Sequence, residues 1–281
     1  MAGRRLHITH RTGYRYADIV DASFNEVRMT PLTTDGQVLL NHTLQVQPVA
    51  SIQSYSDYWG AMVEAFDVHV PHRLLEIVAI SMVDTPPLPA PRPGSTWEAL
   101  SDPRVQDANA ELLMPTDYVD LALDDSRAEV AAAMRASATP GAAAALAVKA
   151  VREHLTYESG ATDVSTTSAQ AWASGRGVCQ DFTHATLSLV RASGIPARYV
   201  SGYLHTEEPA VGRTVVGESH AWVEYWDDGW CAVDPTNDRA VGSAHVIVAR
   251  GRDYADVPPL KGIYAGGTSE GLGVSVEITQ L

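Results

Sequence analysis

Cysteine is scarce in this sequence: Cys179 and Cys231 are the two cysteines in 281 residues. Two cysteines are too few for the disulfide framework of a small secreted domain, and they fit a reducing cytoplasm. Long apolar runs are also lacking. No stretch is long enough to span a membrane, and no apolar segment follows Arg4 and Arg5 as it would in a signal peptide. We therefore expect a cytoplasmic protein without a membrane anchor.

Basic residues are outnumbered. The chain has 20 Lys and Arg against 34 Asp and Glu, which gives a formal net charge of −14. Binding to nucleic acid or to an anionic membrane surface requires a basic footprint, so we expect neither as a partner. The acidity itself indicates solubility rather than a particular partner. The oligomeric state is left open.

Several motifs that bind metals or nucleotides are missing as well. The sequence has no His-Glu-x-x-His and no Cys-x-x-Cys, and His184 and His205 lack the spacing of zinc ligands. It has no clustered-carboxylate loop for calcium, no phosphate-binding Gly-x-x-x-x-Gly-Lys-Ser/Thr and no Gly-x-Ser-x-Gly of a serine hydrolase. We therefore expect neither a metal nor another cofactor.

The first 85 residues have the pattern of strands. β-Branched and aromatic residues alternate in part with polar ones, and Asp35-Gly36 and Trp59-Gly60 supply turn residues between the runs. No helical periodicity interrupts them. We predict a β-sandwich over residues 1–85, with strands at 6–10, 38–46, 62–68 and 74–83.

A proline-rich segment then marks a boundary, since residues 85–94 hold five prolines. Proline cannot continue a helix or a central strand, so we predict an extended linker over 86–107. Residues 108–281 form the predicted catalytic domain, and the fold class is α+β. We expect helices from about Asp124 (with Ser126 and Glu129 at capping-box spacing), at 140–154, at 168–172 (capped by Ser168) and at 179–192. We expect strands at 197–204, 219–226, 230–233 and 273–278, the last closing the same sheet.

Cys179 lies at the predicted start of a helix, after Gly175 and Gly177. A helix N-terminus lowers the pKa of a cysteine there, and the glycines allow a close approach and leave space for a substrate. A free cysteine is more often a buried, inert residue, but the His and Asp downstream reverse that expectation. Cys231 lies mid-strand, far from any helix start, and we assign it a packing role.

His220 and Asp234 flank a predicted hairpin whose loop is Asp227-Asp228-Gly229. A three-residue loop is typical of a type I turn followed by a left-handed glycine. That register pairs Trp226 with Trp230, Glu224 with Ala232, Trp222 with Asp234 and His220 with Thr236. His220 and Asp234 are then diagonal neighbours on one face, whereas a two-residue loop would put them on opposite faces.

Two further features have alternative interpretations. Trp222 and Trp230 share the face of His220, where they either wall the site against water or form core. The segment 205–218 is either a solvated connector or one rim of the cleft. Asp181 is interpreted as a carboxylate at the helix start, paired with Arg198, rather than as a fourth catalytic group.

These segments resemble the bacterial transglutaminase-like superfamily. The resemblance lies in GVCQDF (177–182), GIPARYVSGY (194–203), HAWVE (220–224) and VDPTN (233–237). LHITHRTGYRY (6–16) and the stretch from Asn25 to Pro31 are similar to the β-rich N-terminal region of one bacterial branch.

The resemblance implies a papain-like arrangement in which a cysteine-bearing helix packs on an antiparallel sheet. Cys179 is then the nucleophile, His220 the general base and acid, and Asp234 the residue that orients it. The Cys179 N–H is the natural first oxyanion donor. The second donor stays open among Gln180, Trp172 and Tyr157.

The function expected from these residues is that of a thiol-dependent hydrolase, a cysteine protease or amidase that acts on a peptide or protein substrate. Transfer of the acyl group to an amine, as in a protein-glutamine transglutaminase, is the alternative. A non-catalytic interaction module is less favoured, because all three residues of the triad are present.

Overall fold

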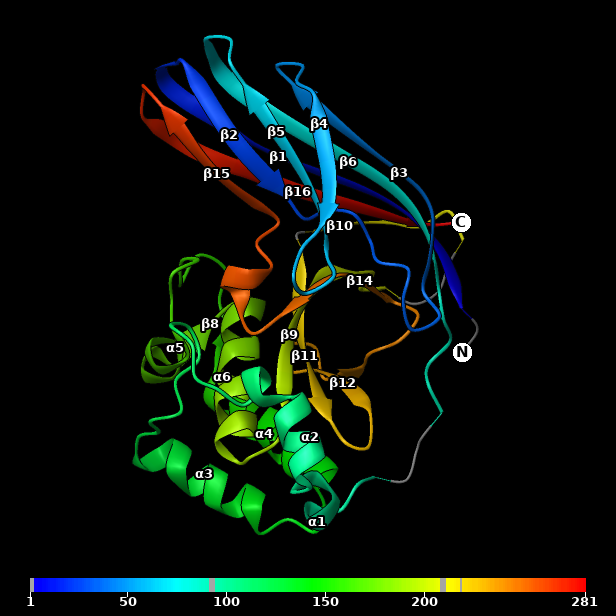
Figure 1. The fold of residues 1–281 in the computed structure, drawn as a ribbon, viewed down its shortest axis with the longest axis vertical. Coiled ribbons are helices and arrows are strands. Elements are labelled where there is room, and N and C mark those ends of the chain that lie inside the picture. Colours follow the sequence, from blue (N-terminus) through cyan, green and yellow to red (C-terminus); the bar gives the residue numbers. More distant parts are fainter. Residues whose placement is uncertain (1–2, 91–93, 208–210, 218) are drawn as a thin grey trace.

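The computed structural model describes residues 3–90, 94–207, 211–217 and 219–281. The described chain has a mixed, strand-rich fold with six α-helices and two short 3₁₀ helices, η1 (Ala110–Leu112) and η2 (Tyr254–Asp256). Figure 1 shows its two regions, an upper region made of long strands and a lower region in which helices surround a smaller sheet. Of the described helices, none is long and apolar enough to cross a membrane.

Two sheets form the upper region. One has the order β10-β16-β1-β6-β3, and the other has the order β15-β2-β5-β4. The strands are β1 (Arg4–Val20), β2 (Ala22–Val27), β3 (Val38–Gln47), β4 (Ile52–Ser56), β5 (Met62–Val68), β6 (His72–Thr85), β10 (Thr214–Gly217), β15 (Leu260–Ala265) and β16 (Ser269–Gln280). Val27 and Phe66 of the second sheet share one apolar cluster with Leu75 and Ile77 of the first. The two sheets therefore bury apolar side chains against each other.

Alternation along β1 explains how the upper region meets the lower one. Leu6, Ile8, His10 and Thr12 are buried, whereas the residues between them are more exposed. Successive side chains of a strand point to opposite faces, so these four share one face. Leu6 and Ile8 belong to the same apolar cluster as the buried residues of the lower region. This cluster spans both regions.

The last strand does not lie where its sequence predicts. Residues 273–278 are expected to close the catalytic sheet, but β16 pairs instead with β1, from Leu6↔Gln280 to Gly13↔Gly273. That prediction is wrong. Val274, Val276 and Ile278 alternate as a half-buried strand does, yet alternation fixes the buried face and leaves the partner strand undetermined. The predicted division into domains stays a prediction.

The lower region contains a second five-stranded sheet, β13-β12-β11-β9-β14, and a two-stranded parallel pair, β7-β8. Helix α6 packs against β9 and β11 and contacts α3, α4 and α5, and nearly all of its side chains are buried. The strands are β7 (Thr156–Tyr157), β8 (Arg176–Gly177), β9 (Ala197–Leu204), β11 (His220–Trp226), β12 (Trp230–Asp234), β13 (Arg239–Ala240) and β14 (His245–Gly251). The helices are α1 (Trp97–Leu100), α2 (Pro103–Ala108), α3 (Asp125–Arg135), α4 (Pro140–His154), α5 (Ser168–Ser174) and α6 (Cys179–Ala192).

Helix caps differ from the prediction by one or two residues. The N-cap of α3 is Asp124, whose carboxylate accepts the Arg127 N–H, and Ser126 bonds to Asp124 instead of capping. The N-cap of α5 is Thr167, in a capping box with Gln170. Ser, Thr and Asp all cap well, so the identity of the cap depends on which of them is held in an extended conformation.

The predicted linker 86–107 contains helix α1 and most of α2. The Trp97 indole N–H donates to the Ser137 carbonyl at 2.7 Å, and Leu100 is buried. The residues that follow the prolines therefore contact the lower region. Residues 91–93 lie outside the described part.

Polar side chains also connect the two regions. The Gln37 amide donates to the Ile247 carbonyl and accepts the Ile247 N–H, much as a neighbouring strand would. Arg250 bonds both to Glu224 on β11 and to Asp35 in the upper region. These contacts hold the upper sheets against the sheet that carries His220.

Candidate functional site

Cys179 is the first residue of α6, and Val178 is its N-cap. The N-terminal end of a helix has free N–H groups and a positive dipole end, which favour negative charge. Asp181 is fully buried, and its carboxylate accepts the Val178 N–H at 2.8 Å and the Thr162 hydroxyl at 2.6 Å. Burial raises the pKa of Asp181, although these hydrogen bonds oppose the shift.

The prediction for Asp181 is right in one part and wrong in another. It is a helix-start carboxylate, but it does not pair with Arg198, which bonds to Glu224 at 2.6 Å. Gly177 allows the predicted close approach at the helix start, since a Cβ there would lie 2.5 Å from the Asp181 side chain. The space for a substrate stays a prediction.

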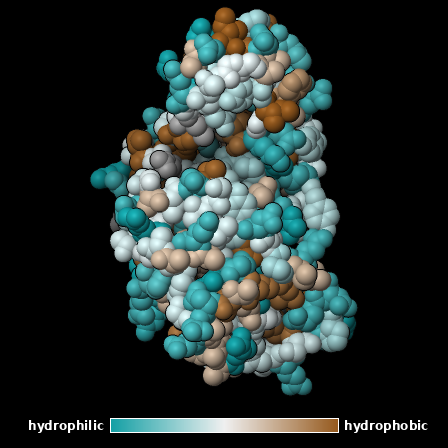
Figure 2. Space-filling view, turned by 90° about the vertical axis from the view of Figure 1, so that its left-hand side faces the viewer, coloured by the Kyte–Doolittle hydropathy of each residue, from teal (hydrophilic) through white to brown (hydrophobic). Residues whose placement is uncertain are grey.

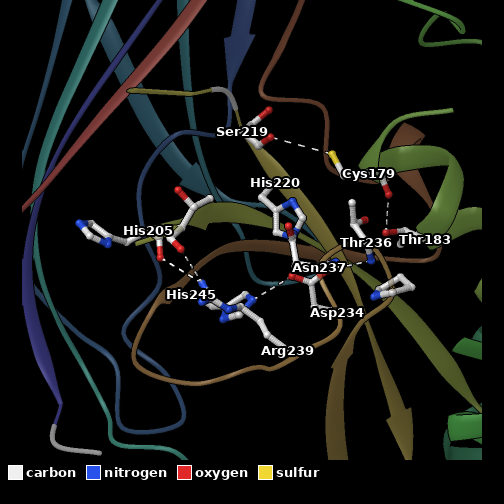
Figure 3. A network of polar contacts seen from close by, with 12 residues as sticks. Cys179, Thr183, His205, Ser219, His220, Asp234, Thr236, Asn237, Arg239 and His245 are labelled. Carbon is white, nitrogen blue, oxygen red and sulfur yellow. Dashed lines mark hydrogen bonds and ion pairs between the residues drawn. The ribbon is translucent and has the colours of Figure 1, made fainter. Parts of the chain in front are cut away.

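His220 lies between Cys179 and Asp234, as Figure 3 shows. Its Nε2 is 2.8 Å from Asp234 Oδ2, which leaves Nδ1 for the sulfur. The chain just before His220 also touches the sulfur, because the Ser219 carbonyl oxygen is 4.0 Å from Cys179 Sγ. The structure therefore brings Cys179, His220 and Asp234 together from α6, β11 and β12.

The hairpin accounts for the position of His220 relative to Asp234. Its loop has three residues, and the observed pairs run from Trp226↔Trp230 to Val223↔Val233, in the predicted register. The turn type differs, since Asp228 has φ 55° and Gly229 has φ 121°. The Asp227 carboxylate accepts the Ser95 N–H outside the hairpin.

Asp234 is almost fully buried and accepts five hydrogen bonds. Its Oδ1 accepts the N–H groups of Thr236 and Asn237, and its Oδ2 accepts from His220, His245 and the Asn237 amide. Burial by itself would raise the pKa of Asp234, but the hydrogen bonds from His220 and His245 lower it well below its usual range. A carboxylate with this many donors is held in one orientation.

His245 is the residue of the site that the sequence analysis missed. Its Nε2 is 3.2 Å from Asp234 Oδ2, and its Nδ1 accepts the Gly242 N–H at 3.4 Å. A backbone N–H can only donate, so the ring proton is on Nε2 and points to Asp234. Burial lowers the pKa of His245, so the ring is neutral at pH 7, although Asp234 opposes the shift. No spacing in the sequence links residue 245 to residue 234.

Trp222 is fully buried and covers both imidazoles. Its ring stacks on His220, with centroids 6.0 Å apart, and meets His245 edge-on at 5.2 Å. Gly202 makes room for it, since a Cβ there would lie 2.7 Å from the indole. Trp222 is thus a core residue that also keeps water from the His220 ring, so both interpretations hold for Trp222.

The remaining candidates fall into two groups. Gln180 and Tyr157 line the cavity at Cys179, and the Gln180 amide donates to the Val164 carbonyl at 3.1 Å. Trp172 lies elsewhere: its indole N–H donates to Ser126, and its ring stacks on His154 at 3.9 Å. That N–H is therefore occupied. His184 is a core residue whose Nε2 accepts the Tyr254 N–H.

The cavity beside Cys179 has a volume of about 930 Å³ and is lined by both regions. The upper region contributes His10 from β1, residues 215–217 from β10 and part of β16. Thr206 lines it as well, so the segment 205–218 forms a rim where it is described, and residues 208–210 and 218 lie outside the described part. The upper sheet is thus one wall of the cleft.

The electrostatics of the cavity favour a charged His220. Burial alone would lower the pKa of His220, but the hydrogen bonds with Asp234 and Cys179 raise it to about 9. By contrast, burial lowers the pKa of His10 to about 4. The two histidines of this cavity therefore carry different charges at pH 7.

His220, Asp234 and His245 are also a group that could hold a metal, since their ligand atoms all lie within 4.8 Å of one another. These atoms already bond to one another, with Asp234 Oδ2 as the shared acceptor. The hydrogen bonds satisfy the group without an ion.

Comparisons with known proteins identify the family of the chain. A family model for the transglutaminase-like superfamily matches residues 128–235, and one for the bacterial transglutaminase-like N-terminal region matches residues 6–84. An uncharacterized protein of Mycobacterium leprae is 41% identical over 99% of both chains. An uncharacterized protein of Mycobacterium tuberculosis is 35% identical over 98% of this chain and 92% of its own length.

Two further matches are more distant. A protein-glutamine gamma-glutamyltransferase of Pseudomonas aeruginosa is 46% identical over 65 residues, which cover 21% of this chain and 10% of that protein. A solved structure from Cytophaga hutchinsonii, named as a putative cysteine protease, has a TM-score of 0.79 at 21% identity and covers 100% of this chain and 92% of that one. The second match shows a shared fold. By its matches along nearly its whole length, the chain belongs to the transglutaminase-like superfamily and carries the bacterial transglutaminase-like N-terminal region.

Proposed function

We propose that this protein is a thiol-dependent hydrolase that cleaves an amide or peptide bond through a thioester on Cys179. The observation that carries the proposal is the position of His220, which lies between the sulfur and a buried carboxylate with five donors. A nucleophile, a base and a residue that orients the base are the parts required for acyl transfer.

The first half of the reaction forms the thioester. The Cys179 thiolate attacks the carbonyl carbon, and the charge moves to the carbonyl oxygen. The Cys179 N–H at the helix start would donate to that oxyanion, with the Gln180 amide or the Tyr157 hydroxyl as second donor. The C–N bond then breaks, and His220 gives its proton to the leaving amine.

The second half releases the acyl group. Neutral His220 takes a proton from water, the resulting hydroxide attacks the thioester, and the C–S bond breaks. The products are a carboxylic acid and the restored thiolate–imidazolium pair. Asp234 stays ionised throughout, because its role is to orient His220 and stabilise its charge.

Transfer to an amine is the second candidate. The match to a protein-glutamine gamma-glutamyltransferase covers 65 residues and favours it. In that reaction an amine replaces water in the second half, and the product is a new amide. A non-catalytic role is less favoured, since the three residues lie together in bonding contact.

Labelling and trapping test the proposal together. Iodoacetamide near neutral pH should alkylate Cys179 much faster than Cys231, which serves as the internal reference. Incubation with peptide pools and glutamine-bearing proteins, with and without a primary amine, then separates hydrolysis from transfer by mass spectrometry of the products. The Cys179→Ala variant should form no acyl adduct. Equal, slow labelling of both cysteines would remove the basis of the proposal.

A further inference from the structure

Strand β10 has a free edge in the upper sheet. It is the end strand of the order β10-β16-β1-β6-β3, and β16 is its sole strand partner within the described part of the chain. The N–H and C=O groups along a free edge are unpaired and can bind another strand. An extended peptide bound in this way is a common form of recognition.

The register identifies which groups of β10 point outward. Gln280 N donates to Arg213 O, and the register continues through Thr214↔Thr279 and Val216↔Glu277. Hydrogen-bonded and non-bonded pairs alternate along an antiparallel ladder. Residues 213, 215 and 217 are therefore the ones that hydrogen-bond to β16. The N–H and C=O groups of Thr214 and Val216 point away from β16.

The free edge borders the cleft of Cys179. Val215, Val216 and Gly217 line the same cavity as Cys179 and His220. Ser219, whose carbonyl oxygen is 4.0 Å from Sγ, follows β10 by two residues. Figure 3 shows the strand leading toward Ser219 and Cys179.

The cleft also indicates which side chains it accepts. Its described lining contains no Asp, Glu, Lys or Arg, in a chain whose net charge is −14. Val274 and Val276 of β16 and Leu204 of β9 contribute apolar surface to it. Figure 2 shows apolar patches on both the upper and the lower half of one face of the molecule. An uncharged segment fits this lining better than a charged one.

We propose that the substrate is an extended, uncharged peptide segment that binds as an added strand on the free edge of β10. This rests on the proposed function, because the added strand carries the scissile carbonyl to Cys179. The backbone of Thr214 and Val216 pairs with every second residue of the segment. The upper sheet then acts as a substrate-binding element, and it selects for an unfolded or loop-like polypeptide.

Reactive peptides test this without knowledge of the natural substrate. Two sets of tetrapeptides built from Ala and Val, one with an N-iodoacetyl group and one with a C-terminal chloromethyl ketone, present the peptide on either side of the sulfur. Their rates of alkylation of Cys179 are divided by those of the parent reagents, iodoacetamide and chloroacetone. We expect this ratio to reach at least about tenfold in one set, the size of one to two net hydrogen bonds.

Proline at the edge provides the matched comparison. Val216→Pro removes one outward N–H and is compatible with an edge strand, so the ratio should fall about tenfold. The same change at the exposed loop residue Val49, which does not line the cleft, should leave the ratio unaltered. N-methylation of the peptide removes one N–H at a time and can be tested on the wild-type protein. The rate ratio should fall when the methyl group is at every second residue of the peptide.

Three results would overturn the inference: a ratio near one in both sets, an unchanged ratio in Val216→Pro, or N-methyl effects without the two-residue period. A failure of the proposed function is distinguishable, since Cys179 would then react with the parent reagents no faster than Cys231. If Val216→Pro does not fold, the N-methyl series in the wild-type protein decides.

Discussion

The charge of His220 depends on Asp234, and this dependence can be measured. The pKa of His220 is raised from 6.5 to about 9, although burial opposes the rise. One pKa unit corresponds to 1.36 kcal/mol, so the folded protein favours the imidazolium by about 3 kcal/mol. An opposite charge in contact shifts a pKa by about one to three units. Asp234→Asn should therefore lower the pKa of His220 by at least about one unit.

Folding stability should follow the same group. The pKa of His220 is higher in the folded state, so its contribution is fully present below pH 6.5 and is lost as the pH rises through about 9. Over that range the wild-type protein should lose stability, on the order of 3 kcal/mol from this group. The free energy of unfolding of Asp234→Asn should change less with pH over the same range.

The assay is an NMR titration of histidine Cε1–H signals, with His220 assigned by its loss in His220→Gln. Urea unfolding at several pH values gives the stability profile. Asp228→Asn is the control, since this exposed turn residue lies on the same hairpin and asparagine tolerates its positive φ. If His220 titrates with the same midpoint in Asp234→Asn and in the wild type, the reasoning is refuted.

Variants at three more positions test other contacts of the lower region. His245→Gln keeps a donor near Asp234 and should preserve most of the Cys179 alkylation rate. His245→Leu removes the donor and should lower the midpoint of the His220 titration. If the role of His245 is purely structural, both variants should change stability and neither should change that midpoint. Gly177→Ala should destabilise the fold by about 1–3 kcal/mol in urea unfolding and slow alkylation of Cys179, because a Cβ meets Asp181 at 2.5 Å; wild-type stability would contradict this. Glu224→Gln should lower the free energy of unfolding by about 3–5 kcal/mol, since it leaves Arg198 without its carboxylate and Arg250 with Asp35 alone. Urea unfolding that matches the wild type would show that these ion pairs do not contribute to stability.

Local chemistry in the sequence determined much of the site. The apolar spacing that follows Cys179 predicts helix α6, because the pattern of a helix depends on residues that are close in the chain. The three residues Asp227–Gly229 predict the register of the hairpin, and so the shared face of His220 and Asp234. These inferences are reliable because each involves contacts between residues that are close in the chain.

Only the tertiary structure decided the rest. β16 joins β1 across more than 250 residues, and the alternation of its valines fits either sheet. His245 reaches Asp234 through the fold, and Trp172 turns its N–H to Ser126 instead of the cleft. The wall of the cleft likewise comes from β10 and β16. Pairing of distant segments depends on which faces become buried together, and a single sequence shows the faces but not their partners.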